Sequence, residues 1–266
     1  MRVAAVQMCS GDDLAANLEE AGRQLDEAAS TGAEWIALPE NFAYLRREGA
    51  PFPCAQDLRG EIVGFVAERA KRHGVWILGG SFPERVDDER VHNTSFLVSP
   101  HGELAAVYRK IHLFDVDLGA QGGGVFEESK SIAPGSEVVV ADTPFGGVGL
   151  SLCYDIRFPE LYLEMSRRGA RFLTVPAAFA PETGRDHWEV LLRARAIESQ
   201  AFVVAPAQWG RHSADRTSHG RSMLVDPWGL VLARAPDRPC VVFADFDLEA
   251  QDRIRRSLPA LQHRRL

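Results

Sequence analysis

Cysteine is scarce in this sequence, and its spacing gives no sign of a disulfide framework. The 266 residues contain four cysteines, Cys9, Cys54, Cys153 and Cys240, which lie far apart and form no CxxC pair. A chain of this length can bury enough apolar surface to fold without disulfide staples. We therefore expect reduced thiols and a cytoplasmic protein.

Excess positive charge and long apolar runs are also lacking. The net charge of −7 argues against binding to a phosphate backbone. We interpret the short basic clusters at residues 253–256 and 263–265 as a solvated helix face and a tail. The first apolar run is too short for a signal peptide, and no run approaches the length of a membrane span. We expect no nucleic-acid partner and no membrane association.

Apolar periodicity divides the chain into two similar halves. The first half has expected strands over residues 2–8, 34–40 and 75–80 and expected helices over residues 13–33 and 61–74. The second half repeats this order, with strands over residues 148–155, 171–179 and 201–209 and helices over residues 158–170 and 187–200. A hairpin closes each half, at residues 95–110 and 222–234, and both hairpins match S-x-L-V-x-P-x-G-x-x-x-A.

This repeated order predicts an α/β fold. Each half should form a sheet with helices on one face, and the two sheets should pack together as an α-β-β-α sandwich with an internal pseudo-twofold. No linker rich in Gly, Ser or Pro divides the chain, so we expect one domain over residues 1–266. The glycine-rich residues 118–124 are expected to form a loop. They lack the spacing of a nucleotide-binding motif.

Three ionisable residues stand where predicted strands end: Glu40, Lys110 and Cys153. Reacting groups gather at such strand ends in layered α/β folds. A lone cysteine in an apolar strand is most often a buried structural residue. The polar flank CYDIRFPE weakens that interpretation of Cys153 without reversing it, and the alternative is a nucleophile at a strand-to-helix corner. Neither His112 nor His187 has a signature spacing to it. A carboxylate base and a lysine are therefore the candidate partners, although Glu40 and Lys110 could each be surface charges.

Motifs over nearly the whole chain resemble those of the nitrilase superfamily of carbon–nitrogen hydrolases. They include LPENF, YRKIHLFDVD, CYDIRFPEL, PAAF, HWEVLLRARAIE, SMLVDPWG and LPALQHRR. The sequence is most similar to the Nit branch of that superfamily. The resemblance implies an α-β-β-α sandwich that pairs through its helices into a homodimer or higher homo-oligomer. It implies no cofactor and no metal.

The resemblance also implies catalytic roles. Cys153 would be the nucleophile, Glu40 the general base and Lys110 the partner of the oxyanion. Many members carry a second glutamate between the lysine and the cysteine. The stretch FEES at residues 126–129 matches it, so Glu128 is the expected residue and Glu127 is its rival.

Four further residues are expected to contact the substrate. The backbone N–H of Tyr154 would complete the oxyanion hole. Substrates of the Nit branch carry carboxylates, so a cation should face the pocket, and Arg157 is the candidate. A structural ion pair with a neighbouring carboxylate is the alternative for Arg157. Phe179 and Thr183 are expected to line the pocket, although Phe179 could equally be a core residue.

The implied reaction is hydrolysis of a small carboxylate-bearing amide through a cysteine thioester. Within the Nit branch, deaminated glutathione is the favoured substrate. The segment LPENFAYLRRE lacks the Phe-Asn-Ser-Pro-Tyr stretch of ω-amidases. The alternatives are an ω-amidase acting on α-ketoglutaramate, a nitrilase or another small aliphatic amidase with the same residues, or a non-catalytic binding member.

Overall fold

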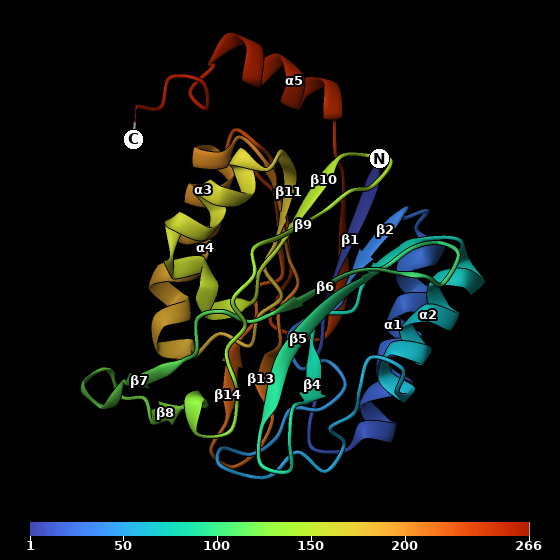
Figure 1. Cartoon of the computed structure of the whole chain (residues 1–266), viewed down its shortest axis with the longest axis vertical. Coiled ribbons are helices and arrows are strands. Elements are labelled where there is room, and N and C mark those ends of the chain that lie inside the picture. The colour runs from blue at the N-terminus through green and yellow to red at the C-terminus, as the bar shows by residue number, and fades with distance from the viewer. Residues whose placement is uncertain (266) are drawn as a thin grey trace.

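Two large sheets pack face to face in the computed structural model, which describes residues 1–265 (Figure 1). Leu266, the last residue of the predicted domain, lies outside the described residues. The first sheet has the strand order β17-β1-β2-β3-β5-β4, with β6 also paired to β5, and the second has the order β16-β15-β12-β11-β10-β9. The strands of the first sheet are β1 (Arg2–Gln7), β2 (Trp35–Ala37), β3 (Trp76–Leu78), β4 (Phe82–Arg85), β5 (Val91–Val98), β6 (Leu104–Arg109) and β17 (Cys240–Asp245). Those of the second are β9 (Val139–Ala141), β10 (Gly147–Leu150), β11 (Ala170–Thr174), β12 (Phe202–Ala205), β15 (Met223–Val225) and β16 (Val231–Arg234).

Helices cover the outer face of each sheet, as Figure 1 shows. They are α1 (Leu14–Ser30) and α2 (Glu61–His73) on the first sheet, and α3 (Pro159–Arg167) and α4 (Pro181–Ser199) on the second. Local sequence explains their ends. The Asp13 side chain accepts a hydrogen bond from the Ala16 N–H at the start of α1. Gly74 ends α2 in the left-handed region, as predicted. We expected this helix to begin at residue 187. Helix α4 begins earlier, because Pro181 opens its first turn.

Alternating side chains build a core on both faces of each sheet. Along β1, Val3 and Ala5 face the second sheet, whereas Ala4 and Val6 face the helices. In the second sheet, Phe172 lies in the layer between the sheets. The structure thus has three apolar layers, one under each helix pair and one between the sheets. The predicted α-β-β-α sandwich is confirmed.

The internal repeat is visible in the strand pairing. Strands β1, β2 and β3 are parallel and are followed by the antiparallel pair β5 and β6. Strands β10, β11 and β12 with β15 and β16 repeat this arrangement in the second sheet. Each sheet gains an antiparallel edge strand beside its first parallel strand, β17 next to β1 and β9 next to β10.

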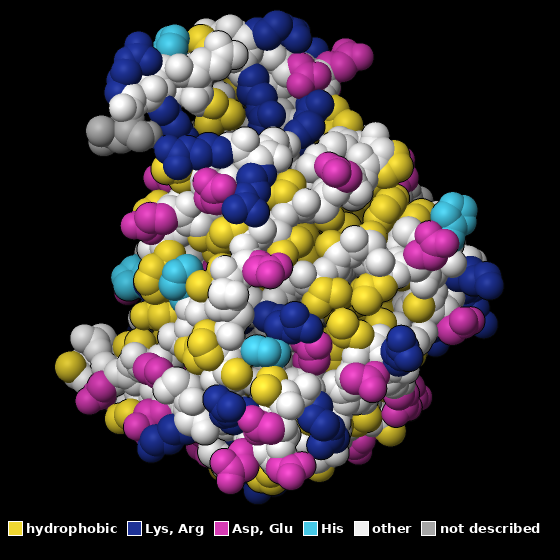
Figure 2. All heavy atoms as spheres, in the orientation of Figure 1, with side chains coloured by type: hydrophobic (Ala, Val, Ile, Leu, Met, Phe, Trp, Pro, Cys, Tyr) yellow, Lys and Arg dark blue, Asp and Glu magenta, His cyan; other side chains and the backbone are white. Residues whose placement is uncertain are grey.

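The C-terminal helix α5 (Leu248–Ser257) lies across one end of the sandwich, at the top of Figure 1. Figure 2 shows basic side chains gathered on this part of the surface. The interpretation as a solvated face holds for Arg253, which is exposed, but not for Arg255. The Arg255 guanidinium donates to the Gln200 and Ala170 carbonyl oxygens, both at 3.0 Å, and so attaches the helix to the second sheet.

The predicted strands are shorter in the structure, and two further segments differ in conformation. The strand expected over residues 148–155 ends at Leu150, and the short 3₁₀ helix η3 (Cys153–Arg157) follows it. The loop predicted over residues 118–124 contains the turn η1 (Gly119–Gln121), which joins β7 (Asp115–Asp117) to β8 (Val125–Glu127). This hairpin projects from the body at the lower left of Figure 1. Within residues 1–265, no helix is long and apolar enough to cross a membrane.

Candidate active site

The structure brings Glu40, Lys110 and Cys153 together in one pocket. Glu40 follows β2, Lys110 follows β6, and Cys153 follows β10. Their exposed fractions are 3%, 2% and 9%. Charged side chains are seldom this buried without a partner. The alternative interpretation of Glu40 and Lys110 as surface charges is therefore wrong.

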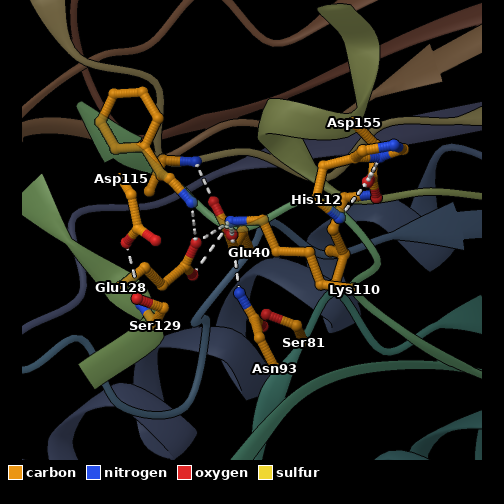
Figure 3. A network of polar contacts seen from close by, with 12 residues as sticks. Glu40, Ser81, Asn93, Lys110, His112, Asp115, Glu128, Ser129 and Asp155 are labelled. Atoms are coloured by element: carbon orange, nitrogen blue, oxygen red, sulfur yellow. Dashed lines mark hydrogen bonds and ion pairs between the residues drawn. The ribbon is translucent and has the colours of Figure 1, made fainter. Parts of the chain in front are cut away.

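Glu40 is held by donors on three separate segments. Its Oε1 accepts hydrogen bonds from Asn93 Nδ2 at 2.8 Å and from Lys110 Nζ at 3.4 Å, and its Oε2 accepts one from the Ala178 N–H at 2.8 Å. Figure 3 shows Asn93 and Lys110 pointing toward this carboxylate. Both oxygens are thereby fixed in position. Asn93 lies in the middle of β5, and no motif or spacing in the sequence marks it as a site residue.

Lys110 is paired more closely with Glu128 than with Glu40. Its Nζ lies 3.0 and 2.8 Å from the two carboxylate oxygens of Glu128. Burial alone would lower the pKa of Lys110, but the negative charges of Glu128 and Glu40 outweigh it and raise that pKa well above its usual value. The ammonium is therefore a permanent positive charge. Glu128 Oε2 also accepts the Phe114 N–H at 2.7 Å, which fixes the carboxylate from its other side.

The choice between the two adjacent glutamates is decided by a short turn. Glu127 is the last residue of β8, and its exposed side chain pairs with Lys130. Glu128 begins the turn η2 (Glu128–Lys130), where the Ser129 N–H donates to Asp115 Oδ1 at 2.9 Å. This turn directs Glu128, and not Glu127, toward Lys110.

Cys153 occupies a strained corner. Its φ of +45° lies in the left-handed region, which costs a non-glycine residue about 1 kcal/mol or more. The Cys153 N–H donates to the Pro176 carbonyl oxygen at 2.9 Å. Burial and the Glu40 charge raise the pKa of the thiol, while the Lys110 charge and the Ala178 N–H oppose them, and the pKa stays well above its usual value. The sulfur is therefore a thiol at neutral pH. The Glu40 carboxylate, which could accept its proton, lines the same pocket.

Asp155 joins the segments around Cys153 through hydrogen bonds. It was not identified as a site residue from the sequence. The carboxylate is fully buried and accepts the Leu152 N–H at 2.9 Å and the Tyr108 hydroxyl at 2.6 Å. It also lies 3.1 Å from the His112 backbone nitrogen and 2.7 Å from His112 Nδ1. The segment that carries Lys110 is thereby tied to the turn that carries Cys153. The polar flank of Cys153 was the available signal.

Aromatic side chains form one wall of the pocket. Phe114 packs against Phe126 and Tyr154, with ring centroids 5.1 and 5.0 Å apart. Tyr154, Phe179 and Thr183 line the pocket. We expected this of Phe179 and Thr183, whereas for Tyr154 the prediction concerned only the backbone N–H. The space inside is about 700 Å³, including the part open to solvent. No group of three or more His, Cys, Asp or Glu side chains within residues 1–265 could hold a metal ion.

Arg157 is not among the residues that line the pocket. Its guanidinium lies over the rings of Phe179 and Tyr154, 5.0 and 5.8 Å from their centroids, and Nη1 is 3.2 Å from His187 Nδ1. The aromatic rings that line the pocket therefore pack against it, and it also contacts α4. The arginines that line the pocket are instead Arg46 and Arg216.

The comparisons with known proteins agree with this geometry. The family model for carbon–nitrogen hydrolases matches residues 2–256. A deaminated glutathione amidase of Synechocystis is 44% identical over 265 residues, which cover 98% of this chain and 97% of that protein. The human deaminated glutathione amidase is 42% identical, over 99% of this chain and 82% of that protein.

Solved structures show the same fold. The C. elegans NitFhit protein has a TM-score of 0.88 and 37% identity over 99% of this chain. The chain spans only 65% of the length of NitFhit. Saccharomyces cerevisiae Nit3, a member of branch 10 of the nitrilase superfamily, has a TM-score of 0.88 and 29% identity over 100% of this chain and 97% of Nit3.

Proposed function

The chain belongs to the carbon–nitrogen hydrolase family, and from this we propose that it hydrolyses deaminated glutathione to 2-oxoglutarate and cysteinylglycine. Relatives named for that activity match it at 37% to 44% identity. The observation that carries the proposal is the buried arrangement of Glu40, Lys110 and Glu128 beside a strained thiol. It combines a proton acceptor, a permanent positive charge and a nucleophile, which are the groups that acyl transfer requires.

In the first half of the reaction the thiol becomes a thioester. Glu40 takes the proton of Cys153 as the sulfur attacks the amide carbonyl carbon. The Lys110 ammonium and the Tyr154 N–H stabilise the oxyanion. The Tyr154 N–H is available because a helix leaves its first N–H groups without intrahelical partners. The C–N bond then breaks. Glu40 returns the proton to the leaving amine, and the acyl group stays on the sulfur.

In the second half water releases the acid. Glu40 takes a proton from a water molecule, which attacks the thioester carbonyl. The C–S bond breaks, and the proton returns to Cys153. Glu128 does not exchange protons in this scheme. It holds the Lys110 ammonium in place and keeps it charged while the Glu40 carboxylate is alternately protonated and free.

Comparison of three substrates tests the function. We expect deaminated glutathione to yield 2-oxoglutarate and cysteinylglycine, and we expect Cys153→Ala to abolish both products. Mass spectrometry of a quenched reaction should detect an acyl adduct on Cys153. Product release that is undiminished in Cys153→Ala would contradict the mechanism. Turnover of α-ketoglutaramate alone would assign an ω-amidase, and ammonia from a small nitrile alone would assign a nitrilase.

We also propose that two copies of the chain pair through α4. Apolar side chains that are 50% to 65% exposed lie on α4 and on the turn between β15 and β16: Val190, Ile197, Trp228 and Leu230. Such side chains are typical of an interface between subunits. Ile197→Glu should produce a monomer in sedimentation experiments, whereas Val86→Glu, at an exposed apolar residue near β4, should not. A parent protein that is monomeric at micromolar concentration would contradict the proposal.

A cytoplasmic location is the third part of the proposal. It is supported by the four cysteines, all of which are free in the structure. Thiol titration of the protein from unbroken cells should find every cysteine reduced, and a stable disulfide would count against this location.

A further inference from the structure

The lining of the pocket carries charges of both signs. Around the thiol, the carboxylates of Glu40 and Glu128 outnumber the single ammonium of Lys110. Arg46, Arg216 and Glu48 also line the pocket, and the charges of Glu48 and Glu128 both act on the Arg46 guanidinium. An anionic group that enters the pocket is therefore repelled near the thiol and attracted toward the two arginines.

Arg46 is built into the wall of the pocket. Its exposed fraction is 7%, although it lies in the loop after the Glu40 strand. Nη2 donates to Ser131 Oγ at 2.6 Å, Nη1 donates to the Ala50 carbonyl oxygen, and the guanidinium lies 4.2 Å from the Phe52 ring centroid. These contacts hold the guanidinium rigidly. A rigid donor loses little conformational freedom when a ligand binds.

Arg46 also keeps unused hydrogen-bonding capacity. A guanidinium offers five N–H donors, and the structure gives Arg46 two hydrogen bonds. Within residues 1–265 it forms no ion pair with a carboxylate. Burial lowers the pKa of its guanidinium, yet an arginine remains charged. A buried cation without a paired carboxylate is costly in folding, so its presence in a pocket indicates a role in binding.

Arg216 reaches the same wall from a distant part of the chain. It lies between β13 (Trp209–Arg211) and β14 (Thr217–His219), and its Nη1 donates to the Arg46 carbonyl oxygen at 3.1 Å. The nearest carboxylate oxygen, Glu48 Oε2, is 3.9 Å away, too far for a direct hydrogen bond. Two guanidinium groups thus share one wall with a single loosely paired carboxylate.

We propose that Arg46 and Arg216 bind a carboxylate of the substrate and thereby select which amide is hydrolysed. The inference rests on the proposed function, because it concerns the substrate of the same pocket. Arginine binds carboxylates through parallel N–H donors, and deaminated glutathione carries a carboxylate at each end. The carboxylate at one end is then held by Arg46 and Arg216. The neutral amide is then left for Cys153.

Kinetics with charged and neutral amides test the role of Arg46 and Arg216. We expect Arg46→Gln and Arg216→Gln each to lower kcat/KM for deaminated glutathione by about 10- to 100-fold, mainly through KM. Hydrolysis of butyramide, which has no carboxylate, should change by less than about twofold. Arg46→Lys should restore part of the loss because it keeps the charge but not the two parallel donors. Arg23→Gln, on the exposed face of α1, is the matched control.

The choice of substrate also shows which carboxylate of deaminated glutathione the two arginines bind. A loss for both α-ketoglutaramate and deaminated glutathione assigns the acyl carboxylate, and a loss for deaminated glutathione alone assigns the carboxylate of the leaving group. Either result supports the proposal. Equal losses for butyramide, unchanged KM in both variants, or an effect confined to Arg157→Gln would overturn it.

A binding experiment separates this proposal from the proposed function. Cys153→Ala protein can be titrated calorimetrically with 2-oxoglutarate and with cysteinylglycine. Together these carry the two carboxylates of deaminated glutathione and a third, which hydrolysis creates on 2-oxoglutarate. The Arg46→Gln and Arg216→Gln changes should weaken at least one of these affinities by about 10-fold or more. Binding that depends on the arginines without any turnover of deaminated glutathione would refute the substrate but keep the carboxylate site. Binding of both compounds that is equally strong without the arginines would refute the site, and thermal unfolding of each variant identifies any that fails to fold.

Discussion

Glu128→Gln is the most informative single change, because the sequence offers its own control next to it. Glu128 and Glu127 are adjacent glutamates, but only Glu128 contacts Lys110. The substitution keeps the size and shape of the side chain and removes its charge. It also turns one oxygen into an amide donor. That donor must face either the Lys110 ammonium or the Phe114 N–H, since both now donate to this carboxylate.

The structure sets the expected magnitude. At the 2.8 Å separation between Nζ and Oε2, the direct attraction is roughly 6 kcal/mol for an effective dielectric constant near 20. Much of this offsets the cost of burying both charges. Removing one partner of a buried pair costs about 3–5 kcal/mol, and Glu40 remains 3.4 Å from Nζ. We therefore expect Glu128→Gln to lower the free energy of unfolding by about 2–4 kcal/mol.

Activity should fall for a related reason. Without Glu128, the Lys110 ammonium is drawn toward Glu40, where it opposes the transfer of the thiol proton to that carboxylate. If the same 2–4 kcal/mol is lost from the transition state, kcat/KM falls by about 30- to 1,000-fold. The measurements are release of 2-oxoglutarate and urea unfolding. Glu127→Gln should change stability by less than about 0.5 kcal/mol and leave the rate unchanged. A Glu128→Gln rate within threefold of the parent, or a larger loss in Glu127→Gln, would refute the reasoning.

Three further changes test the surroundings of the site. Asp155→Asn should lower the free energy of unfolding by about 2–4 kcal/mol and slow the reaction, because an amide nitrogen replaces an oxygen that accepts buried donors. Measurements of unfolding and of kcat check the two effects. His212, whose pKa is lowered to about 4 by burial, binds its proton near pH 6.5 only when the chain is unfolded, so stability should fall as the pH drops from 6.5 to 4. His212→Asn should remove up to roughly 3 kcal/mol of that loss in urea unfolding across this pH range. Gly80→Ala should destabilise the protein by about 2–4 kcal/mol, because φ is +45° and the new Cβ would lie 2.0 Å from the Pro39 carbonyl oxygen. Gly64→Ala, in open space on α2, is the control and should stabilise the protein by about 0.5–1 kcal/mol. Thermal unfolding measures both changes.

The layers of this protein were predictable from its sequence. Alternating apolar residues along β1 and the helical spacing in α1 and α2 mark which face each element buries, and that information is local. The repeated hairpin at residues 95–106 and 222–233 indicated two equivalent sheets, which the strand pairing confirms. Glu40, Lys110 and Cys153 could be selected because they stand at strand ends and match family motifs.

The rest depended on contacts between distant residues. The pocket cations are an example, because Arg46 is held by Ser131, 85 positions away, and Arg216 contacts Arg46 across 170 positions. Arg157 is four residues from the nucleophile, yet it packs behind the aromatic rings. Sequence proximity to the cysteine was therefore a poor guide to which arginines line the pocket.

The sequence by itself determined which segments form strands and helices and which residues are able to react. Only the tertiary structure decided which side chains share the pocket. The spacing of apolar residues along an element depends on which face is buried, so it can be read from residues that are close in sequence. The direction of a loop side chain is set instead by donors and acceptors contributed by distant segments, as for Glu40 and its partner Ala178, which lie 138 positions apart and follow strands of different sheets. Those partners meet only after the two sheets have packed.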